Sequence, residues 1–388
     1  MAHVCERCFG PLEVQYNLDK KPIDRVELAQ RPRTIWRYRE LLPVGDDASI
    51  VDLGTGLTPL HRCLNLGKTL GLKNLYVKDD TTNPTNSFKD RPASVAISKA
   101  REFGVTAVGC PSTGNLAASV AAHAAKAGLP CYVFIPADTE INKVLQASVY
   151  GAKIIAVDGT YDEANRLAAE VAEEHGWAFA NINLRPYYVE GSKTLAFEIC
   201  EQLGWENPDN VIIPLGSGAL LCAMDRGFKQ FKEAGLTQGQ LPRLIGAQGE
   251  GSDPIVRAFK NGSTGVPPIE KPTTIAKSLA IGDPGDGKYV LKAIRSSGGL
   301  AESVNDEEIL AAIHLLARTE GIFVEPAGGV TVGVLKKLVE QGKLDPDERT
   351  VCCVTGNGFK ATDTILRTLA PLRPIEPTLE AFEKYLEA

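Results

Sequence analysis

One lysine of this sequence stands where a reactive amine would be useful. Lys89 lies in the segment 83–91, NPTNSFKDR, after a turn and just before an expected helix. Asp90 followed by Pro92 is typical of an N-cap with a proline in the first helical turn. An ordinary lysine has a pKa near ~10.4, but burial or a positive neighbour such as Arg91 lowers the pKa of such an amine. Lys89 is therefore a candidate Schiff-base lysine, although most lysines simply face water.

Three further loops carry groups that suit an anionic ligand, and each follows an expected strand. Ser112 to Asn115 open a helix, so their hydroxyls and free N–H groups suit a carboxylate, with a plain helix cap as an equal alternative. Residues 216–220 join a strand to a helix through two glycines, which lets the backbone approach a phosphate. Thr355 ends a buried strand and could offer its hydroxyl to a ring nitrogen or to its own turn.

Other ligand motifs are incomplete. The loop at 216–220 lacks the third glycine of a dinucleotide motif, which is Leu221, and Gly67-Lys68-Thr69 lacks the first glycine of a P-loop, which is Arg62. Cys5 and Cys8 have the spacing of metal ligands. No second pair follows, and structural zinc sites need four ligands, so no metal site is predicted.

The elements that position these loops alternate between short apolar runs and amphipathic or alanine-rich stretches, which is typical of βα units around a parallel sheet. Because ligands collect at the carboxyl ends of such strands, we expect the loops to converge. The Gly-, Pro- and Thr-rich region 262–287 is expected to be a long surface connection. Expected strands are 105–110, 131–135, 153–157, 210–214, 243–247 and 350–354, and expected helices are 115–127, 139–150, 161–175, 219–234 and 306–319.

Composition narrows the class of protein. The 388 residues are 44% hydrophobic and 23% charged, which predicts a soluble protein with a large core and two domains. A net charge of −6 argues against nucleic acid as a partner. No secretory signal and no apolar run near the ~20 residues that span a bilayer is evident, which favours a cytoplasmic protein without membrane contact. Nine scattered cysteines fit reduced thiols.

Together, a positioned lysine, an anion site at a helix start, a glycine phosphate loop and a strand-end hydroxyl meet the needs of pyridoxal phosphate. A hydroxyl at the ring nitrogen, in place of an aspartate, favours a neutral pyridine, which suits elimination and replacement chemistry.

From about Asp52 to Leu369 the sequence resembles the threonine synthases of the tryptophan-synthase-β-like pyridoxal-phosphate enzymes. The resemblance rests on the order and spacing of five segments, 83–91, 112–115, 190–194, 216–220 and 355–360. It implies an α/β fold of two open, twisted, mostly parallel sheet domains flanked by helices, with the cofactor cleft between them. The implied parts are an N-terminal segment with a truncated Cys knuckle (1–45), a large domain (46–90 and 190–375), a smaller α/β domain (91–189) and a C-terminal tail (376–388).

The resemblance also implies roles for residues. Lys89 would be catalytic, holding the cofactor and moving protons, with Phe88 beside the ring. Asn115 would bond the phenolic oxygen and Thr355 would face the ring nitrogen. The phosphate would be held by Gly216, Ser217, Gly218, Ala219 and Leu220, and the substrate by Ser112, Thr113, Asn183, Arg185, Ser192 and Lys193.

The implied reaction converts O-phospho-L-homoserine and water to L-threonine and phosphate in a homodimer. The α and β protons leave, phosphate is eliminated from the γ carbon, and water adds to the β carbon. One departure concerns the substrate phosphate: many members have Asn-Pro-x-Arg before Glu-Gly, where this chain has Arg185-Pro186-Tyr187-Tyr188, so Arg185 is a hypothesis for that task. Alternatives are a related β-replacement enzyme or dehydratase, such as cysteate synthase with phosphoserine and sulfite, and a non-catalytic amino-acid-binding scaffold.

Overall fold

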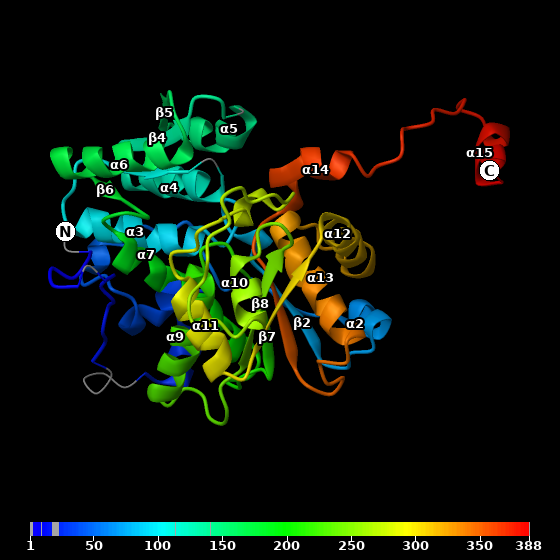
Figure 1. The fold of residues 1–388 in the computed structure, drawn as a ribbon, viewed down its shortest axis with the longest axis horizontal. Helices are drawn as coiled ribbons and strands as arrows, with labels where there is room; N and C mark the ends of the chain where they lie inside the picture. The colour runs from blue at the N-terminus through cyan, green and yellow to red at the C-terminus, as the bar shows by residue number, and fades with distance from the viewer. Residues whose placement is uncertain (1–2, 9, 18–22, 113, 140, 388) are drawn as a thin grey trace.

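The computed structural model describes residues 3–8, 10–17, 23–112, 114–139 and 141–387. Two sheets lie in separate lobes (Figure 1). The smaller sheet contains β4, β5 and β6 and lies beside α4, α5 and α6, and the larger sheet contains β2, β7 and β8. The helices α3 and α7 run between the two sheets (Figure 1).

The strands are β1 (Leu60–Arg62), β2 (Leu75–Asp79), β3 (Val108–Pro111), β4 (Cys131–Pro136), β5 (Lys153–Val157), β6 (Ala178–Phe179), β7 (Asn210–Pro214), β8 (Arg243–Gly249), β9 (Leu300–Val304) and β10 (Thr350–Val354). The α-helices are α1 (Arg25–Gln30), α2 (Leu64–Leu70), α3 (Asp90–Glu102), α4 (Asn115–Ala127), α5 (Ile141–Val149), α6 (Tyr161–His175), α7 (Arg185–Ser192), α8 (Thr194–Gln202), α9 (Ala219–Glu233), α10 (Pro254–Lys260), α11 (Gly287–Ser296), α12 (Asp306–Glu320), α13 (Pro326–Glu340), α14 (Thr362–Leu366) and α15 (Leu379–Leu386). Short 3-10 turns are η2 (Ile35–Leu41), η3 (Asp47–Ser49), η4 (Asp80–Thr82), η5 (Lys277–Leu279) and η6 (Gly358–Ala361).

The larger sheet has the order β1-β2-β10-β7-β8-β9, and only the β1–β2 pair is antiparallel. Its central strands are apolar on both faces because helices cover both. In β7, Val211 and Ile213 belong to the core that includes α8 and α9, whereas Ile212 faces the core that includes α12 and α13. This double burial explains why β7 and β10 are continuous apolar runs in the sequence.

The smaller sheet has the order β5-β4-β3-β6 and is parallel throughout. Its strands all lie between residues 108 and 179, whereas the strands of the larger sheet lie before and after them. Small side chains let α4 pack closely here, since Ala117, Ala121 and Ala124 are buried in the same core as Val108 and Val133. The expected α/β fold class is confirmed, and the domain boundaries given above remain a prediction.

The expected helices and strands are largely confirmed, and α4, α6, β5, β7 and β10 have the expected bounds. The start of α3 differs. Lys89 occupies the N-cap position and Asp90 is the first helical residue, because the Asp90 carboxylate bonds back to Thr85 instead of capping the helix. The strand expected from Val105 begins at Val108, because the Val105 N–H still bonds to Ala100 at the end of α3.

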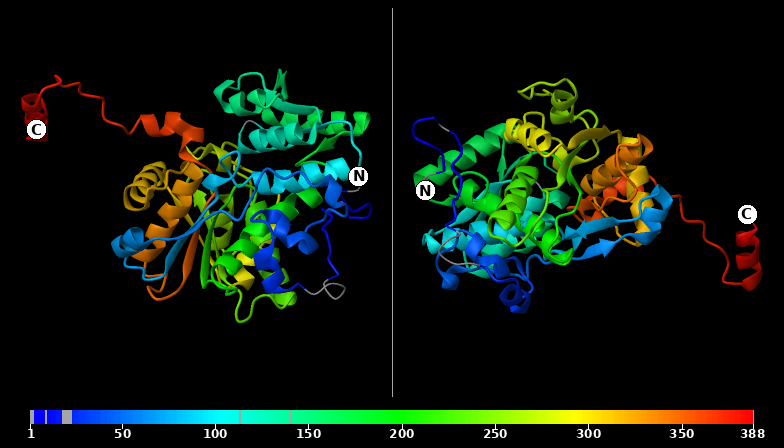
Figure 2. Two further views of the ribbon diagram at one scale, coloured as in Figure 1. Left: turned by 180° about the vertical axis from the view of Figure 1, so that it is seen from behind. Right: turned by 90° about the horizontal axis from the view of Figure 1, so that it is seen from below.

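The C-terminal part leaves the body of the molecule. After α14 the chain runs extended to α15, which stands apart from both lobes (Figures 1 and 2), and none of the residues of α15 is buried. Between α10 and α11 the chain forms the expected long connection, which contains only η5. Among the described residues, no helix combines the length and the apolar character needed to cross a membrane.

Candidate active site

Three loops meet at one edge of the larger sheet because their strands are neighbours. β2, β10 and β7 lie side by side and parallel, with Asp79 opposite Val354. Parallel neighbours are about 4.8 Å apart and end at the same edge. The turns that carry Lys89 and Thr355 and the glycine loop 216–220 therefore follow three adjacent strand ends, where ligands bind in open α/β sheets.

Backbone pairing holds the segment before Lys89 against the end of β10. The Phe88 N–H donates to the Thr355 carbonyl at 2.9 Å, and the Asn357 N–H donates to the Asn86 carbonyl at 3.0 Å. Asn86 has a φ of +62°, a left-handed conformation that asparagine tolerates better than most residues. This pairing brings the expected lysine and the expected strand-end hydroxyl into one structural unit.

A carboxylate fixes the same turn from the other side. Asp90 accepts hydrogen bonds from the N–H of Thr85 at 2.6 Å and from its hydroxyl at 2.7 Å, and both residues are buried. The Thr85 hydroxyl also lies 2.8 Å from the hydroxyl of Ser119 on α4. Lys89 therefore projects from a turn that hydrogen bonds fix to the Thr355 turn on one side and to α4 on the other.

The amine of Lys89 lies among aromatic and polar groups. Its Nζ donates to the Tyr188 hydroxyl at 3.1 Å and lies 4.6 Å from the centre of the Phe88 ring. Tyr188 is buried and comes from α7, between the two sheets. Lys89 is half-buried and Thr355 is buried.

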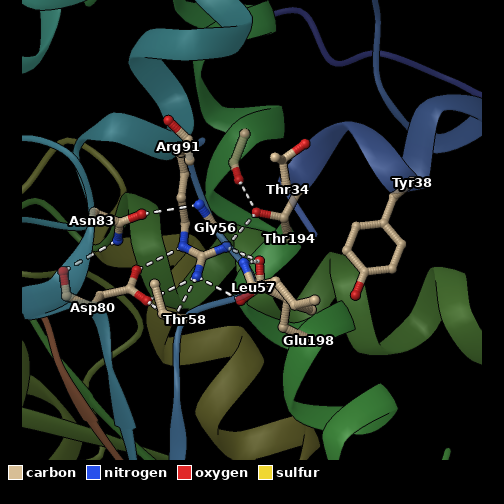
Figure 3. Close-up of polar contacts among 12 residues, drawn as sticks. Thr34, Tyr38, Gly56, Leu57, Thr58, Asp80, Asn83, Arg91, Thr194 and Glu198 are labelled. Carbon is tan, nitrogen blue, oxygen red and sulfur yellow. Dashed lines mark hydrogen bonds and ion pairs between the residues drawn. The ribbon is translucent and has the colours of Figure 1, made fainter. Parts of the chain in front are cut away.

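Directly after Lys89, the side chain of Arg91 enters a fully buried polar cluster, which we call the Arg91 network (Figure 3). Its guanidinium bonds to Asp80 at 2.6 and 2.8 Å and to both oxygens of Glu198. Lys78 forms a second ion pair with Glu198 at 2.7 Å. Burial alone would raise the pKa of Glu198, but Arg91 and Lys78 outweigh it and bring the pKa to about 2. The two cations, Lys78 and Arg91, and the two anions, Asp80 and Glu198, are therefore all paired, as buried charges must be.

The Arg91 network also includes uncharged partners that connect distant segments. Arg91 bonds to the hydroxyls of Thr58 at 3.1 Å and Thr194 at 3.0 Å. Gly191 has no room for a side chain, since a Cβ there would lie 2.2 Å from the Arg91 carbonyl oxygen. The start of α3 is thus fixed against α8 and the end of β2, which fixes the base of Lys89.

The glycine loop 216–220 has the shape of a phosphate cradle. Gly218 has a φ of +97°, and a Cβ there would lie 2.3 Å from Val290, so only glycine fits. The loop leads straight into α9, whose first N–H groups have no partner within the helix and favour an anion. Beside Gly356, the hydroxyl of Ser87 is buried without a partner among the described residues. These features fit a phosphorylated, polar cofactor.

Three polar pairs join elements of the smaller sheet to elements of the larger sheet around Lys89, and we call them the bridging pairs. In the first, Asn115 Nδ2 donates to both carboxylate oxygens of Glu325, at 3.0 and 3.1 Å. In the second, Arg185 pairs with both oxygens of Asp286 at 2.7 Å. The third joins Lys360 Nζ to the Gln146 side chain at 2.7 Å.

Arg185 is thereby placed beside the glycine loop. The Asp286 N–H donates to the Ser217 carbonyl at 3.2 Å, and the Asp286 Cβ would lie 3.4 Å from a Cβ at Gly218. Asp286 ends the long connection between α10 and α11, so this connection reaches the glycine loop. The Arg185 guanidinium, at the start of α7, therefore lies next to the expected phosphate cradle.

Two expected substrate ligands have local polar partners. The Asn183 amide is used by backbone groups, accepting from the Phe179 N–H at 2.7 Å and donating to the Trp177 carbonyl at 2.8 Å. Lys193 is fully buried, pairs with Glu190, and lies 3.9 Å from the Tyr16 ring centre. Local partners already use the polar groups of both residues, and the substrate-binding role expected for each stays a prediction.

The remaining expected ligands are less constrained. The Ser112 hydroxyl accepts from the Gly114 N–H at 3.3 Å, within its own loop. Ser192 is buried at the end of α7. Thr113 lies outside the described residues. The roles expected for Ser112 and Ser192 remain predictions.

The structure adds residues that the sequence did not indicate. Tyr188, Glu325, Asp286 and Lys360 all contact expected site residues or the turn before Lys89. Tyr188 stands where many members of the resembling family have arginine, which was a usable signal. Glu325 directly precedes a proline at a helix start and reads as an ordinary helix boundary, and Asp286 lies in an irregular connection, so neither has a local signature.

Comparison with known proteins agrees with this geometry. A family model described as "Pyridoxal-phosphate dependent enzyme" matches residues 51–356. The chain is 44% identical to a threonine synthase of Methanocaldococcus jannaschii over 99% of this chain and 95% of that protein. It is 40% identical to a threonine synthase of Methanosarcina acetivorans over 98% of this chain and 94% of that protein.

Solved structures show the same fold at lower identity. A threonine deaminase isoform from Solanum lycopersicum superimposes with a TM-score of 0.69 at 22% identity, covering 88% of this chain and 96% of that chain. Maize serine racemase gives a TM-score of 0.67 at 22% identity, covering 86% and 93%. The matched family model, the relatives that align over nearly the whole chain, and the geometry around Lys89 all agree. The chain belongs to the pyridoxal-phosphate dependent enzyme family.

Proposed function

We propose that this protein is a threonine synthase, which converts O-phospho-L-homoserine and water to L-threonine and phosphate. The proposal is supported by threonine synthases that are 39–44% identical over 86–99% of this chain. The observation that carries it is the arrangement around Lys89: one fixed amine beside a glycine cradle, a strand-end hydroxyl and a cation on a bridging pair.

In this proposal pyridoxal phosphate, when bound, supplies an electron sink for the negative charge that develops on the substrate carbon. Loop 216–220 and the start of α9 would hold its phosphate. Thr355 would meet the ring nitrogen through its hydroxyl, and Asn115 would donate to the phenolic oxygen. Phe88 would pack beside the ring, since it already lies next to the Lys89 amine.

Lys89 would hold the cofactor and then move protons. Its Nζ is placed by the tied turn and by the Tyr188 hydroxyl at 3.1 Å. A general acid or base must reach the proton that it transfers, and a lysine on a fixed turn at the cofactor can reach several neighbouring carbons. Because Tyr188 is buried and its hydroxyl accepts a hydrogen bond from Lys89, it can hold the free amine in one orientation.

Arg185 would bind the phosphate of the substrate. Arginine binds planar or tetrahedral oxyanions through several N–H groups. In the structure its partner is Asp286, whose N–H bonds to the Ser217 carbonyl of the glycine loop. A substrate phosphate would compete with this carboxylate for the guanidinium. Ser112, Thr113 and Ser192 would bind the substrate carboxylate or phosphate as the resemblance implies.

On the resemblance we also propose that the enzyme is a cytoplasmic homodimer. Light scattering of the purified protein would then give about twice the chain mass of 41.6 kDa. A mass that stays at one chain at micromolar concentration would refute the dimer.

The activity is tested by incubating the protein, loaded with pyridoxal phosphate, separately with O-phospho-L-homoserine, with phosphoserine plus sulfite, and with threonine. We expect phosphate and threonine in equal amounts from the first incubation. Phosphate release from phosphoserine only, or ammonia from threonine without turnover of phosphohomoserine, would replace the proposal by a β-replacement enzyme or a dehydratase.

A further inference from the structure

Glu325 is a buried carboxyl group inside the candidate active site, and neither the motifs nor the proposed reaction gives it a task. It is 6% exposed and directly precedes α13. Carboxylates are rarely buried unless a partner compensates for the lost hydration. The groups around Glu325 therefore indicate its role.

The position of Glu325 is built into the backbone. Its N–H donates to the Gly356 carbonyl at 2.9 Å, and the preceding Val324 pairs with Asn357. A Cβ on Gly356 would lie 2.4 Å from the Glu325 Oε1 atom, so the turn after Thr355 is bare where the carboxyl group lies. Three chain segments thus run side by side, and they place Glu325, the Thr355 turn and the turn before Lys89 next to one another.

The polar groups that face Glu325 come from several elements. Asn115 faces it from α4, Lys89 and Lys360 face it from the two turns, and the Ser278 hydroxyl faces it from η5. Burial raises the pKa of Glu325 above its ordinary value, although Asn115, Lys360 and Lys89 act against this rise. The carboxyl group is therefore the acceptor in an otherwise donor-rich site.

The contact with Asn115 defines which way that amide points. An amide has an –NH2 donor and a carbonyl acceptor of nearly the same shape, so its partners decide its orientation. Nδ2 lies 3.0 and 3.1 Å from the two Glu325 oxygens, and a carboxylate can only accept. The –NH2 group carries two hydrogens, so one can serve Glu325 and the other remains for a second acceptor.

We propose that Glu325 is a positioning residue of this active site, which orients the Asn115 amide so that its second N–H is presented to the phenolic oxygen of the cofactor. This inference rests on the cofactor-binding role proposed for Asn115 and requires nothing about the substrate. Without the carboxylate, the amide is free to turn its carbonyl oxygen toward the cofactor, where two acceptors would repel each other.

The test uses the apoprotein and pyridoxal phosphate alone, with dissociation constants from absorbance titration. Glu325→Gln is expected to weaken cofactor binding about tenfold, the loss typical of one hydrogen bond to a charged group. The pH midpoint of the visible cofactor band should also shift downward, because a negative charge near the Lys89 linkage favours its protonated form. Glu325→Asp should restore part of both effects, since aspartate keeps the charged, acceptor-only carboxylate, whereas the glutamine amide can also donate to the Asn115 oxygen.

A double-mutant cycle separates positioning from a general structural loss. If Glu325 acts through Asn115, adding Glu325→Gln to Asn115→Ala should weaken cofactor binding by less than twofold. The matched control is Glu340→Gln at the exposed end of the same helix, which should bind like the wild type. Thermal melting of each apoprotein checks that it is folded.

Two outcomes would overturn the inference. One is a Glu325→Gln protein whose cofactor affinity and band midpoint equal those of the wild type. The other is full additivity of Glu325→Gln and Asn115→Ala in the cycle. Because cofactor binding is measured without substrate, these results are independent of whether the enzyme releases phosphate from O-phospho-L-homoserine.

Discussion

The polar groups on the two sides of Lys89 are built in different ways. In the Arg91 network the charged side chains are fully buried, and Arg91 itself has four side-chain partners, Thr58, Asp80, Thr194 and Glu198. Each bridging pair joins elements of different sheets, and the Arg185 side chain is 35% exposed. A buried network with several partners per charge fixes one geometry. A single, partly exposed pair can exchange its partner when a ligand arrives.

This difference assigns separate tasks to the two regions. The Arg91 network would hold the base of Lys89 whether or not a ligand is present. In the bridging pairs, Arg185 would exchange Asp286 for the substrate phosphate, whereas Asn115 would keep Glu325 and offer its second N–H to the cofactor. Substitutions in the network should therefore change stability first, and substitutions in the bridging pairs should change ligand affinity first.

The largest effect should come from the amine between the two regions. Lys89→Ala should lower the rate of phosphate release by about a thousandfold or more, since a positioned acid or base contributes about 10²- to 10⁴-fold and covalent holding of the cofactor is also lost. The visible cofactor band should disappear. Lys99→Ala in α3 is the control. A Lys89→Ala enzyme with wild-type turnover would show that Lys89 is not the catalytic lysine.

Breaking the buried network should destabilise the fold. Arg91→Met leaves Asp80 and Glu198 without their shared guanidinium, and removing one partner of a buried ion pair costs about 3–5 kcal/mol. Urea unfolding of the apoprotein measures this loss, with Arg101→Met at the exposed end of α3 as control. A change below about 1 kcal/mol would show that the network is not the rigid part.

Acid should weaken the same network. The pKa of Glu198 is held near 2, below its ordinary value near ~4.3, so the folded protein binds fewer protons there than the unfolded chain. The stabilisation is therefore complete above about pH 4.3 and is lost as the pH falls toward about 2, up to about 3 kcal/mol. Unfolding free energies between pH 6 and pH 3 should fall less steeply for Glu198→Gln than for the wild type; equal slopes would contradict the assignment.

The smallest effect should come from a bridging pair. Arg185→Ala should raise the KM for O-phospho-L-homoserine about tenfold to a hundredfold through loss of charged hydrogen bonds to the phosphate. Its unfolding free energy should stay within about 1 kcal/mol of the wild type, because the pair with Asp286 is partly exposed. Inhibition by inorganic phosphate analogues should weaken in parallel, and an unchanged KM would exclude Arg185 as the phosphate ligand.

The same contrast explains what the sequence could predict. β7, β10 and α4 are recognisable because burial on both faces or on one helical face leaves a periodic pattern. Lys89 and the glycine loop carry local signals, a turn before a helix and glycines between a strand and a helix. These features depend on residues close together in the chain.

The contacts between distant segments could not be predicted in this way. Glu325 reaches Asn115 across 210 positions, and Arg185 reaches Asp286 across 101. Lys193 shows the same limit: the segment 190–194 was recognisable in the sequence, but the ion pair of Lys193 with Glu190 was not. Sequence patterns identified the neighbourhood, and packing decided which side chains enter it.

The most direct test of the account is the identity of the lysine that holds the cofactor. The protein, loaded with pyridoxal phosphate, would be reduced with borohydride, digested, and analysed by mass spectrometry for the peptide that carries the cofactor. We predict that the modification lies on Lys89. Modification of Lys360, which also faces Glu325, or of the buried Lys193 would contradict it.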